Sequence, residues 1–292
     1  MTGWTIGVIG GSGLYRLEGL EEPQWHAVET PWGRPSDRIL SGRIGTTRLL
    51  FLPRHGGGHA IPPADINARA NIDALKRLGA TDILALSSVG SLREELEPGR
   101  FVIVDQFIDR TTARPASFFG PGLTAHVPLA DPVCPRLAAL AAEAADEAGA
   151  PIARGATYLA MEGPQFSTRA ESRLYRRWGA DVIGMTAMPE ARLVREAELP
   201  YALVGMVTDY DSWREEEDGV DVAEILRRMR GNTAVAHRLV AALARALPPE
   251  RPPSPIDTVL DTAILTAPSA RDPAMIARLD AILARLTASR AI

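Results

Sequence analysis

Apolar, β-branched segments alternate along this chain with segments of helical periodicity, and this alternation restricts the possible folds more than any other feature. Segments such as "WTIGVIGG", "TDILALSSVGS" and "YALVGMVTDYD" are apolar on both faces, as expected for strands covered by helices on each side. Helical patterns such as "NARANIDALKRLG" and "PRLAALAAEAADEAG" lie between strand-like segments. Strands that alternate with helices predict an α/β fold whose central sheet is parallel over a substantial part.

A proline-rich segment near the C-terminus, "LPPERPPSP" at residues 247–255, divides the chain. It follows a long helical pattern at about residues 221–247. We therefore expect one large domain over residues 1–250, followed by a proline-rich joint and a helical appendage over residues 251–292. The appendage is predicted to be one amphipathic helix with Asp272 as N-cap and Pro273 as first residue. Its apolar stripe contains Ile276, Leu279, Ile282, Leu283 and Leu286.

The composition excludes several classes of protein. The 292 residues are 46% hydrophobic and 23% charged, as is usual for a globular chain, and the formal charge of −4 gives no basic field for nucleic acid. Cys134 is the only cysteine, which excludes an intrachain disulfide and a cysteine-based metal site. The sequence shows neither a signal peptide pattern nor an apolar run long enough to cross a membrane, so we expect a cytoplasmic protein.

A glycine turn follows the first strand-like segment in "GVIGGSGLY". Ser12 lies within this turn, where backbone N–H groups and a hydroxyl can approach an anion closely. The alternative interpretation is a dinucleotide-binding fingerprint, which a nicotinamide-dependent dehydrogenase would need. That motif requires a third glycine where this chain has Arg16, so the signal for it is weak.

Other polar side chains follow later strands. Arg54 and His55 end an apolar run and precede three glycines in "FLPRHGGGHAIPP", and Arg offers a planar set of donors suited to phosphate. Hydroxyls follow two further strands, at Ser87 and Ser88 and at Thr186, where a helix begins. Together these residues predict a pocket for inorganic phosphate. The remaining histidines, His26, His59, His126 and His237, show no metal-ligand spacing, and we interpret His26, His59 and His237 as surface or packing residues.

Two carboxylates end the last strand-like segment, in "MVTDYDSW". Residues two apart in an extended chain point to the same face, so Asp209 and Asp211 are predicted to lie side by side. Such a pair is costly at the end of a buried strand unless it binds a ligand. The alternative is an acidic turn after an edge strand.

Seven motifs occur in order over roughly residues 6–215: "IGGSGLY", "RHGGGHAIPPADINARANIDALK", "SSVGSL", "VIVDQFIDRT", "EGPQFSTRAES", "GMTAMPEA" and "VTDYDSW". They closely resemble the trimeric purine nucleoside phosphorylase family, and within it the members that act on 5′-methylthioadenosine. The resemblance implies an α/β fold with a mixed, partly barrel-like central sheet flanked by helices on both faces. It also implies a homotrimer that uses no organic cofactor and no metal, with inorganic phosphate as co-substrate.

The resemblance implies a role for each matching residue. Phe166 would stack near the purine, Met185 would lie under the ribose, and Val222 would contact the methylthio group. His126 would reach the active site of the neighbouring subunit. Asp209 would be the catalytic acid at purine N7, and Asp211 would accept from the 6-amino group. The residues assigned to phosphate are Ser12, Arg54, His55, Ser87, Ser88 and Thr186.

The expected reaction is phosphorolysis of 5′-methylthioadenosine to adenine and 5-methylthioribose 1-phosphate, by a pentosyltransferase of purine and methionine salvage. A carboxylate at position 211 suits a 6-amino purine, which donates a hydrogen bond there. The first alternative is a phosphorylase for 6-oxopurine nucleosides or methylthioinosine. The others are the dehydrogenase mentioned above and a non-catalytic nucleoside-binding protein.

Overall fold

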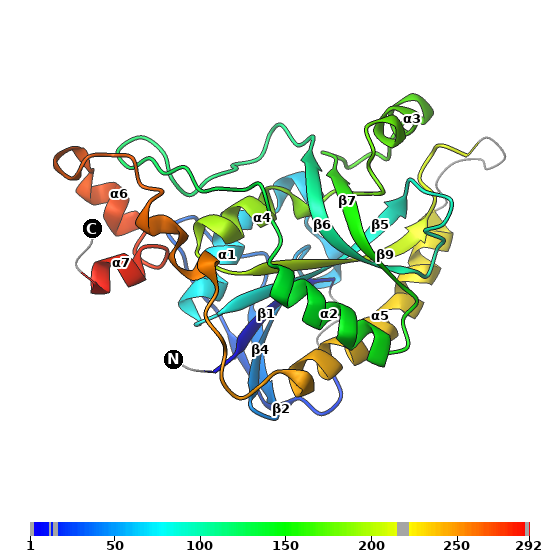
Figure 1. The fold of residues 1–292 in the computed structure, drawn as a ribbon, viewed down its shortest axis with the longest axis horizontal. Coiled ribbons are helices and arrows are strands. Elements are labelled where there is room, and N and C mark those ends of the chain that lie inside the picture. Colours follow the sequence, from blue (N-terminus) through cyan, green and yellow to red (C-terminus); the bar gives the residue numbers. More distant parts are fainter. Residues whose placement is uncertain (1–2, 12, 14–16, 215–221, 290–291) are drawn as a thin grey trace.

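The computed structural model describes residues 3–11, 13, 17–214, 222–289 and 292 of the chain (Figure 1). Within these ranges nine strands form one mixed sheet. In spatial order the strands are β2 (Glu21–His26), β3 (Ile39–Ile44), β4 (Thr47–Pro53), β1 (Thr5–Gly10), β5 (Asp82–Ser91), β8 (Val182–Gly184), β7 (Ile152–Ala160), β6 (Phe101–Asp109) and β9 (Tyr201–Asp209).

Strand β5 closes part of this sheet into a barrel. It pairs in parallel with β1 through Ala85, in parallel with β9 along its other edge, and antiparallel with β8 at Gly90 and Ser91. The five strands β5, β8, β7, β6 and β9 therefore form a closed ring, and β1 to β4 extend from it as an open wing. The predicted mixed, partly barrel-like sheet is confirmed.

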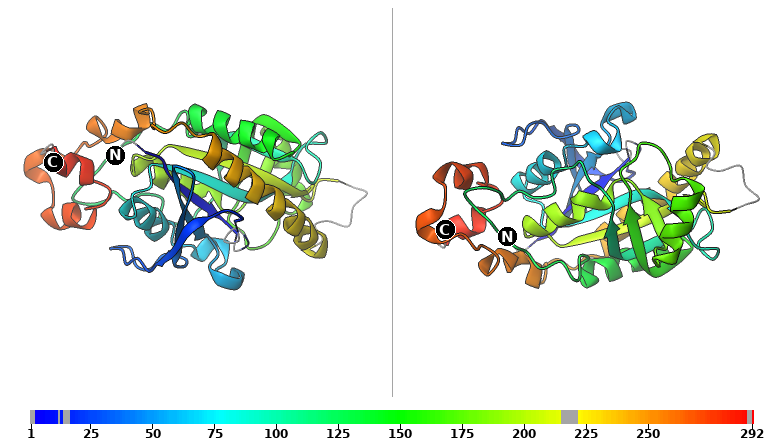
Figure 2. Two further views of the ribbon diagram at one scale, coloured as in Figure 1. Left: turned by 90° about the horizontal axis from the view of Figure 1, so that it is seen from below. Right: turned by 90° about the horizontal axis from the view of Figure 1, so that it is seen from above.

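Helices cover both faces of the sheet, as predicted (Figure 2). Alanine-rich faces of α2 and α5 pack together and against one side, where small side chains permit close approach of the backbones. Helices α1 and α4 pack on the other side, against a second apolar cluster. The helices are α1 (Ala68–Arg77), α2 (Pro135–Glu147), α3 (Arg169–Arg177), α4 (Ala187–Glu196), α5 (Val222–Ala246), α6 (Pro273–Arg278) and α7 (Ala284–Ala288). None of the helices in the described part of the chain is long and apolar enough to cross a membrane.

The C-terminal segment differs from its prediction. It starts as expected, with Asp272 capping Ala274 N–H and Pro273 in the first turn, but the single amphipathic helix is wrong. Two short helices, α6 and α7, are separated by a turn. Leu279, Ile282 and Leu283 are all buried, and breaking the helix lets these three side chains reach the same core cluster. Between them Asp280 pairs with Arg77 of α1.

The C-terminal tail, residues 251–292, is joined to the rest of the protein by an ion pair as well as by packing. Glu198, which follows α4, accepts from Arg285 of α7 and from the backbone N–H of Leu260 at 3.0 Å. Leu260 lies in the 3₁₀ segment Pro255–Asp261 and is buried in the same cluster as α4. The tail therefore contributes to the core on the α1 and α4 side of the sheet.

Candidate active site

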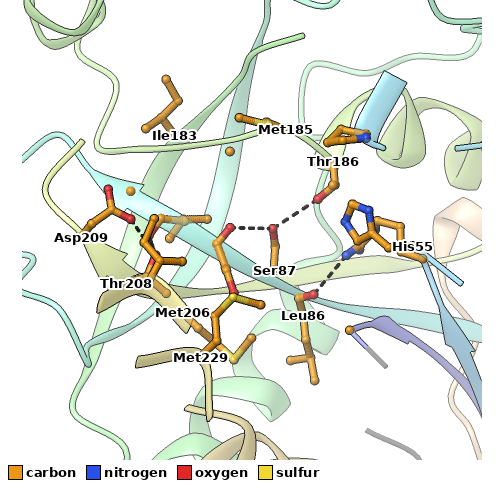
Figure 3. Close-up of a pocket in the computed structure, with 18 of the residues that line it drawn as sticks. His55, Leu86, Ser87, Ile183, Met185, Thr186, Met206, Thr208, Asp209 and Met229 are labelled. Carbon is orange, nitrogen blue, oxygen red and sulfur yellow. Dashed lines mark hydrogen bonds between the residues drawn. The ribbon is translucent and has the colours of Figure 1, made fainter. Parts of the chain in front are cut away.

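A cavity of about 240 Å³ opens where β5 changes its strand partner (Figure 3). On this edge β1 pairs with β5 only as far as Ala85, and β8 joins at Gly90. Residues 86–89 lie between these two pairings and form no strand pair with the described residues of β1 or β8 on this edge. All four of these residues line the cavity. Ser87 and Ser88 thus lie inside β5 rather than after it, which corrects the predicted end of this strand.

Arg54 follows β4 and lies at one end of the cavity, only 3% exposed. Its Nε donates to Glu190 Oε2 at 2.9 Å, its Nη2 to Glu190 Oε1 at 3.0 Å, and its Nη1 to the Leu86 carbonyl at 3.2 Å. Burial lowers the pKa of Arg54, but the Glu190 carboxylate more than reverses this, so the guanidinium stays charged. Among the described residues these contacts use one N–H on each nitrogen, which leaves one on each terminal nitrogen for an anion.

His55 lies beside Arg54 in a glycine loop that requires unusual backbone angles. Gly56 has φ +68° and Gly58 has φ +69°, values that favour glycine. The ring of His55 stacks on that of His59 with 4.0 Å between centroids, and its Nδ1 lies 2.8 Å from the Ile61 carbonyl oxygen. Burial lowers the pKa of His55 to about 4, with Arg54 and His59 adding to the effect.

Hydroxyls stand next to this loop. Ser87 Oγ lies 3.2 Å from Thr186 Oγ1 and 3.2 Å from the Ser88 carbonyl oxygen. Thr186 is the N-cap residue of α4, but its hydroxyl does not cap the helix and is turned toward Ser87 instead. The predicted phosphate residues Arg54, His55, Ser87, Ser88 and Thr186 all line the cavity. Ser12 lies outside the described residues.

The two aspartates lie at the opposite end of the same cavity, as Figure 3 shows for Asp209. The prediction that both lie on one extended strand is wrong. Strand β9 ends at Asp209, and Asp211 has φ +46°. A turn brings them together instead, with Asp211 N–H donating to Asp209 Oδ1 at 2.8 Å. Gly90 permits this approach, because a side chain there would meet Asp209 Oδ1 at 3.0 Å.

The two carboxylates have different surroundings. Asp209 accepts at both oxygens, from Asp211 N–H and from the Thr208 hydroxyl at 2.7 Å. Asp211 is 5% exposed, and its Oδ2 has no hydrogen-bond partner among the described residues. Burial raises the pKa of Asp211, and the nearby Ser172 and Ser167 hydroxyls oppose this only in part. An unpartnered buried acceptor of this kind is suited to a ligand that donates.

Apolar side chains line the space between the phosphate end and the aspartates. Phe166 lines the cavity and is 45% exposed, so its ring is accessible to a ligand. Val222 begins α5, but its side chain is outside the described set, and Ile225 of the same helix lines the cavity. The other apolar residues of this wall are Met161, Ile183, Met185, Met206 and Met229.

One predicted site residue lies away from the cavity of its own chain. His126 is exposed and its backbone N–H donates to the Ala263 carbonyl at 2.9 Å, next to the C-terminal tail. It does not line the cavity. In the part of the chain that the structure describes, no cluster of His, Cys, Asp and Glu is arranged to hold a metal ion.

The sequence interpretation missed two residues that contact the site from behind, Glu190 and Tyr201. Glu190 and Tyr201 hold Arg54 in place, with the Tyr201 hydroxyl donating to Glu190 Oε1 at 2.8 Å. A signal for Glu190 exists in the sequence, because an arginine at the end of a buried strand needs a carboxylate partner. His59 lines the cavity, but it is exposed and stacks on the ring of His55, which agrees with its interpretation as a surface or packing residue.

Comparison with known proteins shows the family of this chain. The profile of the Phosphorylase superfamily matches residues 5–245. The S-methyl-5′-thioadenosine phosphorylase of Cereibacter sphaeroides is 57% identical over 283 residues, which cover 96% of this chain and 98% of that protein. The protein of the same name from Bradyrhizobium diazoefficiens is 53% identical and covers 98% of this chain and 99% of its own length.

Solved structures agree with the sequence comparison. A methylthioadenosine phosphorylase from an Antarctic soil metagenomic library superposes with a TM-score of 0.91 at 42% identity, covering 97% of this chain and 99% of its own. The methylthioadenosine phosphorylase of Schistosoma mansoni in complex with adenine superposes with a TM-score of 0.76 at 36% identity, covering 83% of this chain and 91% of its own. The predicted resemblance is confirmed, and the chain belongs to the Phosphorylase superfamily, among the nucleoside phosphorylases.

Proposed function

We propose that this protein cleaves 5′-methylthioadenosine with inorganic phosphate, giving adenine and 5-methylthioribose 1-phosphate. One observation supports this most strongly: a single cavity contains Arg54, His55 and two hydroxyls at one end and Asp209 with Asp211 at the other. Two relatives, both named S-methyl-5′-thioadenosine phosphorylase, are more than half identical to this chain over nearly its full length. The reaction uses phosphate as a co-substrate and no cofactor.

The ends of the cavity serve the two halves of the reaction. Phosphate bound by Arg54, Ser87 and Thr186 approaches the anomeric carbon and offsets the positive charge that develops on the sugar. The purine leaves as a poor anion unless its N7 receives a hydrogen bond or a proton, which we assign to Asp209 as the catalytic acid. The carboxylate of Asp211, which lines the same cavity, accepts from the 6-amino group.

The apolar side chains of the cavity contact the remaining parts of the substrate. Phe166 covers the purine, and Met185 lies beneath the ribose. Ile225 and Met229 of α5 give the methylthio group an apolar surface.

We further propose a cytoplasmic homotrimer in which the partner subunit's His126 completes the 5′ end of the site. The exposed position of His126 away from its own cavity supports this assignment. Mass photometry tests the assembly, and a trimer is expected. In His126→Ala the KM for methylthioadenosine is expected to rise while the KM for phosphate stays unchanged; equal changes in both would contradict the assignment.

The preference for a 6-amino purine separates this function from its nearest alternative, a 6-oxopurine nucleoside phosphorylase. The test measures phosphate-dependent base release from methylthioadenosine, methylthioinosine, adenosine and inosine. We expect the highest kcat/KM for methylthioadenosine. A higher kcat/KM for inosine or methylthioinosine would overturn the adenine assignment, and base release without phosphate would overturn phosphorolysis.

A further inference from the structure

Strands β7 and β8 are neighbours in the barrel, and the residues that follow them, Met161 and Met185, line the cavity. The backbone N–H of Met161 donates to the Gly184 carbonyl of β8 at 2.9 Å. The next strand along the sheet, β6, ends close by, because the Arg110 N–H donates to the Ala160 carbonyl of β7 at 2.8 Å. The segment after β6 therefore lies next to the part of the chain that lines the cavity.

Arg114, in the segment after β6, binds the backbone that follows both β7 and β8. Its side chain is 5% exposed and does not line the cavity. Its Nη1 donates to the carbonyl oxygens of Met185 at 2.6 Å and Met188 at 2.9 Å. Its Nη2 donates to the Glu162 carbonyl at 2.6 Å and to the Met161 carbonyl at 3.5 Å, and its Nε donates to Glu162 Oε1 at 2.8 Å. All five N–H bonds of the guanidinium therefore have an acceptor, and four of these acceptors are backbone carbonyls.

The Glu162 carboxylate fixes the guanidinium in this orientation. Its Oε2 accepts from the backbone N–H groups of Thr112 at 2.6 Å and Ala113 at 3.3 Å, while its Oε1 accepts from Arg114. Burial raises the pKa of Glu162, but these N–H groups and the guanidinium outweigh burial, so the carboxylate stays charged. The loop that carries Arg114 is thus tied to the end of β7.

Met185 is also confined at its side chain. Gly163 has φ +69°, and a Cβ there would lie 2.5 Å from Met185 Sδ. Met188 has φ −118° and ψ 138°, which are not helical angles, although this residue lies in the range of α4. Its carbonyl therefore turns away from the helix axis, where Arg114 binds it. Arg114 at the backbone and Gly163 at the side chain together determine where Met185 lies in the cavity.

We propose that Arg114 is a positioning residue for this reaction, which holds Met185 in contact with the ribose by binding the backbone carbonyls of Met185 and Met188. The proposal rests on the function assigned above, since it requires a sugar over Met185. Arg114 acts through Met185 and does not touch the substrate, because it does not line the cavity. A displacement of about 1 Å at a reacting group can reduce its rate by about a hundredfold, so these contacts affect turnover.

Lysine cannot replace Arg114 in this role. It keeps the positive charge beside Glu162, but its three N–H bonds diverge from one nitrogen, whereas the guanidinium places five in one plane. In Arg114→Lys the carbonyls after β8 and those after β7 therefore cannot all be bound. The variant separates loss of the carbonyl contacts from loss of the charge.

The test compares the dissociation constants of adenine and methylthioadenosine in calorimetric titrations without phosphate. Adenine has no sugar, so in Arg114→Lys its dissociation constant should stay within about threefold of the wild-type value. The dissociation constant of methylthioadenosine should rise at least about tenfold, and kcat/KM with phosphate present should fall by at least the same factor. A folded Arg114→Lys variant whose affinities for the two ligands change equally, or do not change, would overturn the proposal.

Glu162→Gln is the matched control. It removes the ion pair with Arg114 but leaves the backbone carbonyls that Nη1 and Nη2 bind. Both variants should lose stability in urea unfolding, but only Arg114→Lys should change the ratio of the two dissociation constants. An equal change of this ratio in Glu162→Gln would contradict the assignment to the carbonyl contacts.

The wild type separates this proposal from the proposed function. Binding of both ligands without phosphate-dependent base release would contradict the proposed function alone. Failure of methylthioadenosine to bind at all would contradict both.

Discussion

Arg54 and Glu190 form a bidentate ion pair inside the protein, with Nε 2.9 Å from Oε2 and Nη2 3.0 Å from Oε1. The pair joins the end of β4 to the first turn of α4, and the Tyr201 hydroxyl attaches it to β9. Both partners are almost fully buried. Glu190 therefore sets the direction of the guanidinium at the phosphate end of the cavity, although Glu190 itself does not line the cavity.

Replacing Glu190 is expected to weaken phosphate binding selectively. In Glu190→Gln one donor of Arg54 faces an amide N–H, the guanidinium turns, and the KM for phosphate rises by about tenfold. The KM for methylthioadenosine should stay within about twofold, because the purine end of the cavity is untouched. Steady-state kinetics with each substrate varied in turn measures both values.

Glu190 is also expected to stabilise the folded protein. Glu190→Ala leaves a buried charge without a partner and should lower the free energy of unfolding by about 3–5 kcal/mol. Tyr201→Phe is the matched control, since it removes one hydrogen bond to the same carboxylate and should cost about 1 kcal/mol. Urea unfolding measures both losses. Equal losses of unfolding free energy in the two variants would contradict the role of Glu190 as the partner of the buried charge.

Asp209→Ala is expected to remove turnover and keep phosphate binding. Without the group at purine N7 the base leaves poorly, and kcat should fall by at least about a hundredfold. Phosphate binds at the other end of the cavity, so its dissociation constant should stay within about twofold. Rapid-mixing assays and calorimetry measure the two quantities, and a kcat near the wild-type value would exclude Asp209 as the catalytic acid.

Asp211→Asn is expected to change the purine preference. Its buried Oδ2 has no partner among the described residues, and an amide N–H in its place would face the 6-amino donor of adenine. The ratio of kcat/KM for methylthioadenosine to that for methylthioinosine should fall by at least about tenfold. A ratio equal to that of the wild type would show that the 6-position is recognised elsewhere.

How much of this could be predicted from the sequence depends on the range of the interactions involved. The pattern of α5 is local, and the expected helix at about residues 221–247 agrees with the observed Val222–Ala246. Closure of the barrel through β5 pairs strands far apart in the chain, and only the resemblance pointed to it. The turn that joins Asp209 to Asp211 depends on Gly90 of another strand, which the spacing of the aspartates does not encode.

The structure of the C-terminal tail also depends on long-range packing that its local sequence pattern does not encode. Its apolar spacing fits one helix, but burial of Leu279, Ile282 and Leu283 against the core decides in favour of two. The stabilisation from burying these side chains exceeds the local preference for a continuous helix.

We propose that residues 251–292 form an appendage that folds only against residues 1–250. Leu283 is 0% exposed and Leu265 of the same tail is 63% exposed. Leu283→Ala should lower the free energy of unfolding by about 2–5 kcal/mol, and Leu265→Ala should change it by no more than about 0.5 kcal/mol. Chemical denaturation followed by tryptophan fluorescence measures both. Two transitions in the wild type, with Leu283→Ala affecting only one, would indicate an independently folded tail.

His55 predicts a pH dependence of stability. Its pKa is about 4 in the folded protein and near 6.5 when unfolded, so between these values the unfolded chain binds more protons. The contribution of neutral His55 is therefore fully present above pH 6.5 and is lost as the pH falls toward 4. Urea unfolding across this range should show a smaller loss of stability in His55→Gln than in the wild type. Equal losses would mean that His55 does not titrate in this way.

Transfer of the sugar to phosphate rather than to water is the central claim, and isotope labelling tests it most directly. The protein is incubated with methylthioadenosine and phosphate labelled with oxygen-18, and the products are analysed by mass spectrometry. We expect adenine and 5-methylthioribose 1-phosphate in equal amounts, with the bridging oxygen of the sugar phosphate carrying the label. Release of adenine together with free 5-methylthioribose whose anomeric oxygen comes from water would contradict the account.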